Sequence, residues 1–378
     1  MDALTTPLPK DWEVKTFRDI STINQGLQIP ISQRLKAPTE HAKFYITIQA
    51  LNNRKEFEYI KTYNESVVCH KDDILMTRTG NTGMVITNIE GVFHNNFFKI
   101  NFDRTLINKD FLVYFLSLEQ TQKTILKKAG TSTIPDLNHN DFYSLLIPLP
   151  PLDEQIAIAN VLSDVDHYLY SLDALILKKE GVKKALSFEL LSQRKRLKGF
   201  NQAWQRVRLG DICEITTGSL DANEMVHYGK YRFYTCAKEY YFIDKYAFDT
   251  EAILISGNGA YVGYVHYYKG KFNAYQRTYV LDNFSEHIIF VKYFLTMFLQ
   301  SHIQTNKNEG NTPYIVMATL KDFKIFLPPL NEQIAIANIL SDVDSEIISL
   351  KNKKRQFENI KKALNHDLMS AKIRVLNK

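Results

Sequence analysis

Two stretches of the chain place apolar residues at alternating steps of four and three positions. One begins after Pro150-Pro151 and the other after Pro328-Pro329, with acidic residues in the first turn, where they favour the positive end of a helix. No further proline interrupts either stretch, so the 3.5-residue period predicts two long helices whose apolar seams pair with another helix. The predicted pairing residues are Ile158, Leu162, Val165, Leu169 and Leu172 in the first helix and Ile336, Leu340, Val343, Ile347 and Leu350 in the second.

The two helices belong to an internal repeat. Residues 150–172 and 328–350 are identical at 17 of 23 positions, with a constant offset of 178. Fainter matches at offsets of 179 and 192 extend the repeat over the regions in front of each helix. The predicted division is into two variable domains, 1–151 and 201–328, each followed by a near-identical helical segment, 152–200 and 329–378.

The length of the helices decides how they are expected to pack. A helix from residue 153 to about 197 would be roughly 65–70 Å long at 1.5 Å per residue, and such a rod cannot bury its apolar stripe alone. Its own repeat is the obvious partner, and antiparallel pairing is the simplest arrangement. The alternative is that each helix packs only on its own domain. Gly181 is a candidate position for a bend.

The variable domains are predicted to mix strands and helices, which makes the fold class α+β. Short runs of β-branched and aromatic residues bounded by Gly, Asn and Asp predict strands. The predicted strands are 44–49, 73–77, 83–87 and 97–100 in the first domain and 252–256, 261–265 and 277–281 in the second. The predicted helices of the domains are 111–126 and 290–303.

The composition of the chain limits its possible functions but does not identify a particular function. The 378 residues are 45% hydrophobic and carry a net charge of +6, and because no basic arm or tail concentrates this charge, it permits DNA binding without arguing for it. The longest apolar run is broken by Lys292 and no secretory signal is apparent, so a cytoplasmic protein with no membrane partner is expected. Cys69, Cys213 and Cys236 lie far apart and are expected to be free, mostly buried thiols.

No group of residues in the sequence has the spacing of a catalytic or metal site. The glycines of loop 257–263 lack the spacing of a nucleotide-binding loop, so a turn with positive φ between two strands is expected there. His94, His139 and His266 are not spaced as metal ligands. Asp136 could begin the carboxylate cluster of a nuclease, but no Glu-x-Lys motif follows it at short range. We therefore expect no catalytic residue and no metal on this chain.

Polar and aromatic residues gather instead in loops that correspond between the two domains. In such loops an Arg can donate two hydrogen bonds to guanine, and an Asn can bind adenine. For each residue the alternative is an ordinary solvated turn. The two domains share their predicted strands and glycines but differ in their loop residues. Two domains that bind different DNA sequences would require this difference. The candidate DNA-binding residues are Thr77, Arg78, Thr79, Asn81, Thr82, Asn95, Asn96, Thr131, Ser132, Asn258, Tyr261, Tyr275, Gln276, Arg277, Asn311 and Thr312.

The motif Pro-Pro-Leu-x-Glu-Gln-Ile-Ala-Ile-Ala occurs at residue 150 and again at residue 328. With this doubled motif, the whole chain resembles the specificity subunit of type I restriction-modification systems. The resemblance implies two target recognition domains, each followed by a conserved helix, with the two helices paired antiparallel as a coiled coil. It also implies that each domain reads one half of a bipartite, asymmetric DNA target, while the paired helices set the spacer.

The same resemblance implies the partners of the chain. They would be double-stranded DNA, two methylation subunits that dock on this chain and bring S-adenosylmethionine, and two restriction subunits that act with ATP and Mg. No cofactor is expected on the chain itself, which would be non-catalytic. Two rival interpretations stay open: a site-specific nuclease hidden in a variable domain, and a scaffold that binds proteins but no DNA.

Overall fold

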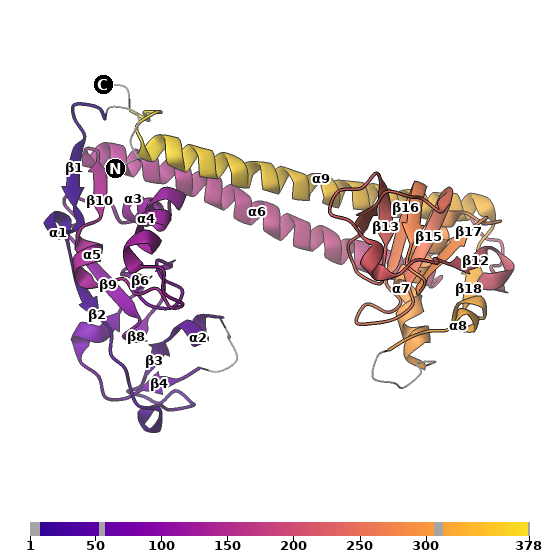
Figure 1. The fold of residues 1–378 in the computed structure, drawn as a ribbon, viewed down its shortest axis with the longest axis horizontal. Coiled ribbons are helices and arrows are strands. Elements are labelled where there is room, and N and C mark those ends of the chain that lie inside the picture. The colour runs from indigo at the N-terminus through magenta and orange to yellow at the C-terminus, as the bar shows by residue number, and fades with distance from the viewer. Residues whose placement is uncertain (1–7, 53–56, 306–312, 377–378) are drawn as a thin grey trace. The chain divides into compact units, whose positions relative to one another are not determined.

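The computed structural model describes residues 8–52, 57–305 and 313–376, and the chain divides into two compact units. The first unit joins Met1–Asp173 to Lys353–Lys378, and the second is Ala174–Asn352. Figure 1 labels the long helices α6 (Leu152–Leu191) and α9 (Leu330–Met369). Each of them contributes residues to both units. Each unit therefore contains one variable domain, the start of one long helix and the end of the other. Because the units divide both helices, the domain boundaries at 151, 200 and 328 stay a prediction.

The first unit builds its variable domain on three small sheets. The four residues of β6 are all buried, because this strand lies between two neighbours in the middle of its sheet. Only β3 and β8 pair in parallel there; the other strand pairs described in this unit are antiparallel. In sheet order the strands are β1 (Glu13–Thr16) and β10 (Leu146–Leu149); β2 (Ser21–Gln25), β9 (Phe97–Phe102), β6 (Ile74–Thr77) and β7 (Val85–Ile86); and β4 (Tyr59–Ile60), β3 (Lys43–Ile46), β8 (Gly91–Phe93) and β5 (Val68–Cys69).

Short helices connect these strands, and polar side chains fix where two of them begin. The Asn108 Oδ1 accepts a hydrogen bond from the Phe111 N–H at 3.0 Å, and the Asn138 Oδ1 accepts one from the Asp141 N–H at 2.9 Å. The helices are α1 (Phe17–Ile20), α2 (Ile48–Asn52), α3 (Lys109–Leu116), α4 (Glu119–Ala129) and α5 (His139–Tyr143). The single helix predicted over 111–126 is two helices, because Leu118 adopts an extended backbone and turns its side chain into the core.

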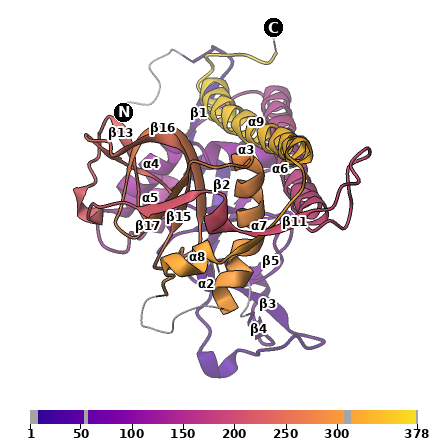
Figure 2. The same ribbon diagram turned by 90° about the vertical axis from the view of Figure 1, so that its right-hand side faces the viewer.

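The second unit has one six-stranded sheet where the first has two four-stranded sheets. Figure 2 labels strands β13, β15, β16 and β17 of this sheet. Its longest pair, β15 and β16, is antiparallel, and α7 contacts both of these strands. In sheet order the strands are β11 (Gln205–Arg208) and β18 (Lys324–Leu327); and β12 (Glu214–Thr217), β17 (Thr278–Asp282), β15 (Phe248–Ser256), β16 (Val265–Ala274), β13 (Tyr231–Tyr234) and β14 (Tyr241–Ile243). The helices are α7 (Ile288–Thr305) and α8 (Met317–Lys321). Two mixed units that share long helices confirm the predicted α+β class.

Three predicted strands are wrong over part of their length. The strand expected over 83–87 is reduced to Val85–Ile86, since Gly83 has a φ of 91°. The strand expected over 44–49 ends at Ile46, because the Thr47 Oγ1 accepts a hydrogen bond from the Ala50 N–H at 3.0 Å and starts α2. The strand expected over 261–265 begins only at Val265, since Gly263 has a φ of 80° and its N–H donates to the Ser256 carbonyl at 2.7 Å. In the latter two places a local hydrogen bond replaces the sheet pairing that the β-branched residues suggested.

The larger core of each unit lies where a variable domain meets both long helices, and a smaller apolar cluster lies inside each variable domain. In the first unit, Ile158 and Leu162 of α6 and Leu368 and Met369 of α9 are at most 2% exposed and share one apolar cluster with Phe111 of α3. The matching residues of the second unit are Ile336, Leu340, Leu190, Leu191 and Phe290. The outer parts of the predicted pairing seams therefore pack on a domain as well as on the other helix.

Farther along, the two helices pair antiparallel inside each unit, as the sequence predicts. Seam residues Leu172 and Ile347 are 5% and 6% exposed, and the rings of Tyr168 and Phe357 lie 4.5 Å apart. Val165, Leu169, Val343 and Leu350 are half-buried. Ion pairs flank the seams: Asp173–Lys354 at 2.7 Å and Asp166–Lys361 at 2.5 Å in the first unit, Lys179–Glu346 at 2.8 Å and Lys183–Asp344 at 2.5 Å in the second.

A tyrosine of each domain joins one of these ion pairs. The Tyr114 hydroxyl donates to Asp166 at 2.8 Å in the first unit, and the Tyr293 hydroxyl donates to Asp344 at 2.6 Å in the second. Burial and the carboxylate raise the pKa of both phenols, so each stays a protonated donor at neutral pH. The resulting Tyr–Asp–Lys junction connects a domain helix to both long helices, once in each unit.

The long helices end at corresponding residues. Gln193 and Ala371, which differ by the repeat offset, have φ values of 63° and 55°. Such positive φ values end a helix, so α6 stops at Leu191 instead of near residue 197 as predicted. Gly181 lies inside α6, where it does not interrupt the helix.

A buried ion pair follows each helix end. The Arg374 guanidinium donates to Glu154 at 2.7 Å, and the Trp12 indole donates to the same carboxylate, which is 2% exposed, at 3.0 Å. In the second unit, Arg196 donates to Glu332, 1% exposed, at 2.5 Å. The end of one repeat therefore neutralises a buried carboxylate at the start of the other helix.

Candidate nucleic-acid interface

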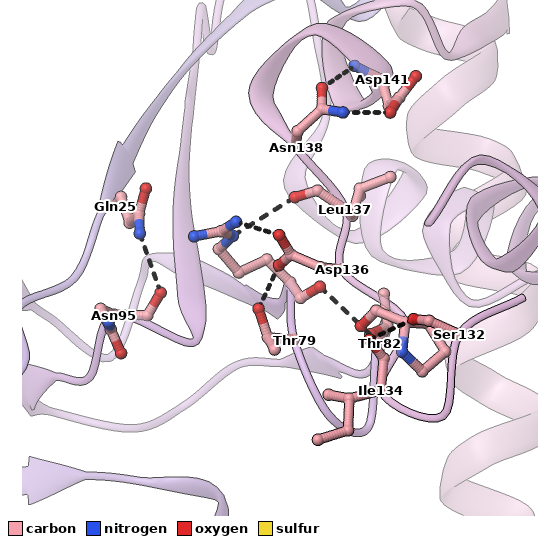
Figure 3. A network of polar contacts seen from close by, with 12 residues as sticks. Gln25, Thr79, Thr82, Asn95, Ser132, Ile134, Asp136, Leu137, Asn138 and Asp141 are labelled. Carbon is pink, nitrogen blue, oxygen red and sulfur yellow. Dashed lines mark hydrogen bonds and ion pairs between the residues drawn. The ribbon is translucent and has the colours of Figure 1, made fainter. Parts of the chain in front are cut away.

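Three loops of the first unit meet beyond the end of β6 (Figure 3). Backbone hydrogen bonds connect them: the Arg78 N–H donates to the Asn96 carbonyl at 2.7 Å, and the Leu137 N–H donates to the Arg78 carbonyl at 2.8 Å. The Thr82 hydroxyl also donates to the Pro135 carbonyl at 2.6 Å. We call this group the loop cluster, and its loops are 77–83, 94–96 and 130–137.

Arg78 lies at the centre of the loop cluster and is mostly committed to it. Its Nη2 forms an ion pair with Asp136 at 2.7 Å, its Nε donates to the Leu137 carbonyl at 3.4 Å, and its guanidinium lies 5.5 Å from the centre of the Phe98 ring. The side chain is 17% exposed. Among the residues that the structure describes, its Nη1 has no hydrogen-bond partner, so one edge of the guanidinium stays available to a ligand.

The other candidates of the first domain differ in what they can reach. Thr77 and Thr82 are buried, and their hydroxyls bond to backbone carbonyls of the cluster, so they can hold the loops but not touch a ligand. The Thr79 hydroxyl donates to Asp136 (Figure 3). Asn81, Thr131 and Ser132 are exposed, and Asn95 and Asn96 are half-buried. The exposed and half-buried candidates lie on the same three loops that the backbone hydrogen bonds of Arg78 and Thr82 hold together.

Two residues at the loop cluster were missed or misinterpreted in the sequence. Gln25, at the end of β2, donates to the Asn95 carbonyl at 3.3 Å (Figure 3). A signal for it exists, because it precedes the repeated Gly26, where a Cβ would lie 2.2 Å from the His94 carbonyl oxygen. Asp136 was considered only as the start of a nuclease cluster, whereas the structure makes it the partner of Arg78.

The second unit assembles the equivalent loops from different residues. Asn258 bridges to Tyr314, and the Gly259 N–H, in a turn with a φ of 81°, donates to the Pro313 carbonyl at 2.9 Å. The expected turn with positive φ at loop 257–263 is thereby confirmed. Gln276, Arg277 and Tyr261 are exposed and Tyr275 and Asn258 are half-buried, whereas Asn311 and Thr312 lie outside the described residues.

The second domain also has an arginine that sequence analysis overlooked. The guanidinium of Arg232, on β13, lies 4.2 Å from the centre of the Tyr240 ring and 4.4 Å from that of Tyr268. Such stacking holds a cation in one orientation. The 21 tyrosines of the chain were a general signal for aromatic contacts, but no spacing in the sequence pointed to this arginine.

Two features are absent from the described residues: groups of three or more possible metal ligands and helices that could span a membrane. Over residues 8–52, 57–305 and 313–376, no three His, Cys, Asp or Glu side chains lie close enough to hold a metal ion. Within the same ranges, no helix is long and apolar enough to cross a bilayer.

The repeated loop clusters define a class of protein with two similar domains that present different polar groups. A family model described as the type I restriction modification DNA specificity domain matches residues 9–179 and again residues 201–359. The chain therefore belongs to the family of type I restriction-modification specificity subunits and carries two DNA specificity domains.

Individual relatives agree with this assignment. The chain is 39% identical over 162 residues to the type I restriction enzyme EcoDI specificity subunit of Escherichia coli, a match that covers 42% of this chain and 35% of that one. It is 24% identical to the MjaVIII specificity subunit of Methanocaldococcus jannaschii over 98% of this chain and 95% of that one.

Solved structures support the fold. The specificity subunit of the type I system of M. genitalium has a TM-score of 0.63 at 18% identity, covering 97% of this chain and 98% of that one. A chain from a study of complex assembly and conformational transition of the type I system has a TM-score of 0.58 at 16% identity, covering 97% and 100%.

Proposed function

We propose that each specificity domain of this chain reads one half of a bipartite, asymmetric DNA target. One observation carries the proposal: both domains bring three corresponding loops together beyond a buried strand, while the side chains on those loops differ. Arg78 and Asn96 in the first domain have the hydrogen-bonding groups that read guanine and adenine, and so do Arg277 and Asn258 in the second. Two different sets of donors require two different half-sites.

The chemistry of the complex is assigned to other subunits. Two methylation subunits would bring S-adenosylmethionine, and two restriction subunits would act with ATP and Mg, so the chain itself would need no cofactor and act without catalysis, in the cytoplasm. The support is family membership together with the lack of a metal-binding group of acidic, His or Cys side chains in the described residues. A net charge of only +6 agrees with this division, because partner subunits would supply much of the attraction to DNA phosphates.

The paired helices are proposed to set the spacer between the half-sites and to dock the methylation subunits. Each helix is 40 residues long, which is about 60 Å at 1.5 Å per residue. In both units the pairing combines an apolar seam with flanking ion pairs and a Tyr–Asp–Lys junction. A stiff pair that begins inside each domain is suited to fixing the separation of two reading surfaces.

The test uses the chain assembled with its methylation subunits. Adenine methylation of a random oligonucleotide library should reveal one motif with two specified halves and a fixed spacer. Exchange of residues 201–328 for the corresponding domain of another specificity subunit should change one half and leave the other. An assembled complex that methylates without sequence preference would contradict the proposal, and so would metal-dependent cleavage by this chain alone.

A further inference from the structure

The two domains place different residues at one equivalent point. Arg78 and Gly257 each follow the last residue of a buried strand, β6 and β15. The Arg78 N–H donates to the Asn96 carbonyl, and the Gly257 N–H donates to the Arg277 carbonyl at 2.8 Å. Arg277 therefore stands in the second domain where Asn96 stands in the first.

The surroundings of this point correspond as well. The Leu137 N–H donates to the carbonyl of Arg78, and the Ile315 N–H donates to the carbonyl of Gly257 at 2.9 Å. The strand register places Tyr279 in the second domain where Phe98 lies in the first. The space over this ring and beside this backbone segment can thus be compared directly between the domains.

The first domain fills that space with its own cation, and the second leaves it open. The guanidinium of Arg78 lies over the Phe98 ring and against the Leu137 carbonyl. In the second domain the same place is a cavity of about 250 Å³, far larger than the roughly 30 Å³ of one water molecule. Its lining residues are Gly257, Gln276, Arg277, Tyr279 and Ile315.

The cavity depends on the glycine. A Cβ on Gly257 would lie 2.3 Å from the Arg277 carbonyl oxygen and 2.9 Å from the Tyr279 ring, so a side chain would need the backbone to move. The Tyr279 hydroxyl donates to the Ile315 carbonyl at 3.0 Å and satisfies the acceptor that an arginine would otherwise bind. The open space is therefore built into this domain.

The charges around the cavity favour a ligand that accepts hydrogen bonds. The carboxylate of Asp136 is replaced by Tyr314, as the matching bridges to Thr79 and Asn258 show. Among the residues that the structure describes, the side chains of Arg277 and Gln276 have no hydrogen-bond or ion-pair partner. Arg277 and Tyr279 both line the cavity, and although burial raises the pKa of Tyr279, the positive charge of Arg277 opposes this rise.

We infer that this cavity receives the acceptor edge of a guanine in the second half of the DNA target. The planar guanidinium of Arg277 donates hydrogen bonds to the O6 and N7 atoms of the guanine, a geometry that suits it. Gln276 lies beside Arg277 in the lining of the cavity. The inference rests on the proposed function, which it deepens by naming a base class and the residue that reads it. In the first domain the guanidinium of Arg78 already occupies the equivalent place. The first domain would therefore read its half-site through other hydrogen-bonding groups.

The experiment measures methylation motifs and DNA affinity for the complex with Arg277→Ala. One guanine of the second half-site should become unspecified, and affinity for the original target should fall about tenfold to a hundredfold. The first half-site should not change. Tyr279→Phe, which keeps the ring and loses only the hydroxyl, provides a second variant that should fold and should also weaken the preference at that position.

The matched control is Lys269→Ala, which removes an exposed cation of the same domain that pairs with Glu251. This control should leave the motif intact. If Arg277→Ala leaves the motif unchanged, or weakens binding to all sequences equally with a smaller salt dependence, Arg277 contacts no base or only a phosphate and the inference is wrong. Both outcomes keep the proposed function, whereas a wild-type complex with no specified second half would contradict it.

Discussion

Arg78 and Gly257 show how much one residue changes at a shared place in the fold. Arg78 is held by Asp136, by the Leu137 carbonyl and by the Phe98 ring, so its free edge has a fixed direction. Its position between Thr77 and the glycines made it a candidate in the sequence, but its partner lies 58 residues away. No local pattern could have identified Asp136 as that partner, or the cavity that replaces the arginine in the second domain.

Two variants distinguish contact between Arg78 and a DNA base from a purely structural role of Arg78 in the loop cluster. If Arg78 contacts a base, Arg78→Ala should relax one position of the first half-site at a loss of about 1–3 kcal/mol of binding. Asp136→Asn keeps the arginine and removes a half-exposed ion pair, so it should change stability by less than about 1 kcal/mol and preserve the motif. Motif analysis of methylated libraries checks both. A motif that relaxes equally in the two variants would show that Arg78 only supports the loops.

The cysteines give a prediction that does not depend on DNA. Burial raises the pKa of Cys69 and of Cys213 to about 12, and the thiolate is the form that reacts with alkylating reagents. At pH 8 in the folded protein, both should resist iodoacetamide. Mass spectrometry of the labelled peptides measures this, with the urea-unfolded chain as a control in which all three cysteines react. Rapid labelling of Cys69 in the folded protein would contradict the described core.

At the scale of elements, the long helices were the most predictable part of the chain. Their 3.5-residue period and near-identity predicted two paired helices, and the pairing is present within each unit. The short strands were less predictable, because Thr47 and Gly263 redirect the backbone through single hydrogen bonds. The Tyr–Asp–Lys junctions could not be predicted, since each one joins three segments that are distant in sequence.

Lengthening the helix pair tests its role in setting the spacer. Four residues inserted after Ser171 in α6 and four after Gln356 in α9 lengthen both helices on the same side of the Asp173–Lys354 ion pair. Each insertion adds about 6 Å and about 40° of rotation. We expect a changed spacer with both half-sites retained in the methylation motif.

The control for the lengthened helices is a matched pair of substitutions. Ser171→Ala and Gln356→Ala alter the same positions without changing the helix length, and the spacer should stay the same. A lengthened complex that keeps the original spacer, while both half-sites remain specified, would show that the helices do not act as the ruler.

At the scale of the whole molecule, each repeat completes the other. The first unit takes Leu368, Met369 and Arg374 from the end of the chain, and the second takes the corresponding residues from the end of α6. Among the described residues, the buried carboxylate of Glu332 pairs with Arg196 and that of Glu154 with Arg374, and the Trp12 indole also donates a hydrogen bond to Glu154. Family membership implied two paired helices, but the exchange of helix ends between units came only from the structure.

Removing one arginine should therefore weaken one unit and spare the other. Arg374→Ala leaves the carboxylate of Glu154 buried with only the indole of Trp12, which should cost about 3 kcal/mol of stability. Hydrogen exchange measured by mass spectrometry should rise in the first unit. Arg196→Ala should have the mirror effect through Glu332, raising exchange in the second unit.

The control for these arginine variants is Lys372→Ala, which removes a half-exposed cation near the end of the chain. It should leave the exchange of both units close to that of the wild type. Equal exchange of both units in both arginine variants would contradict separate stabilisation.

The contribution of Leu368 and Met369 to the first core also has a consequence for biosynthesis. The residues of the second unit leave the ribosome as one uninterrupted stretch, whereas the first unit also needs residues from Lys353 onward, which follow that stretch. At about 5–20 residues per second, the resulting delay is roughly ten to forty seconds after the strands of the first unit have emerged. Because domains usually fold in the order of their synthesis, we expect the reverse here: the unit whose strands are translated first should complete its core last.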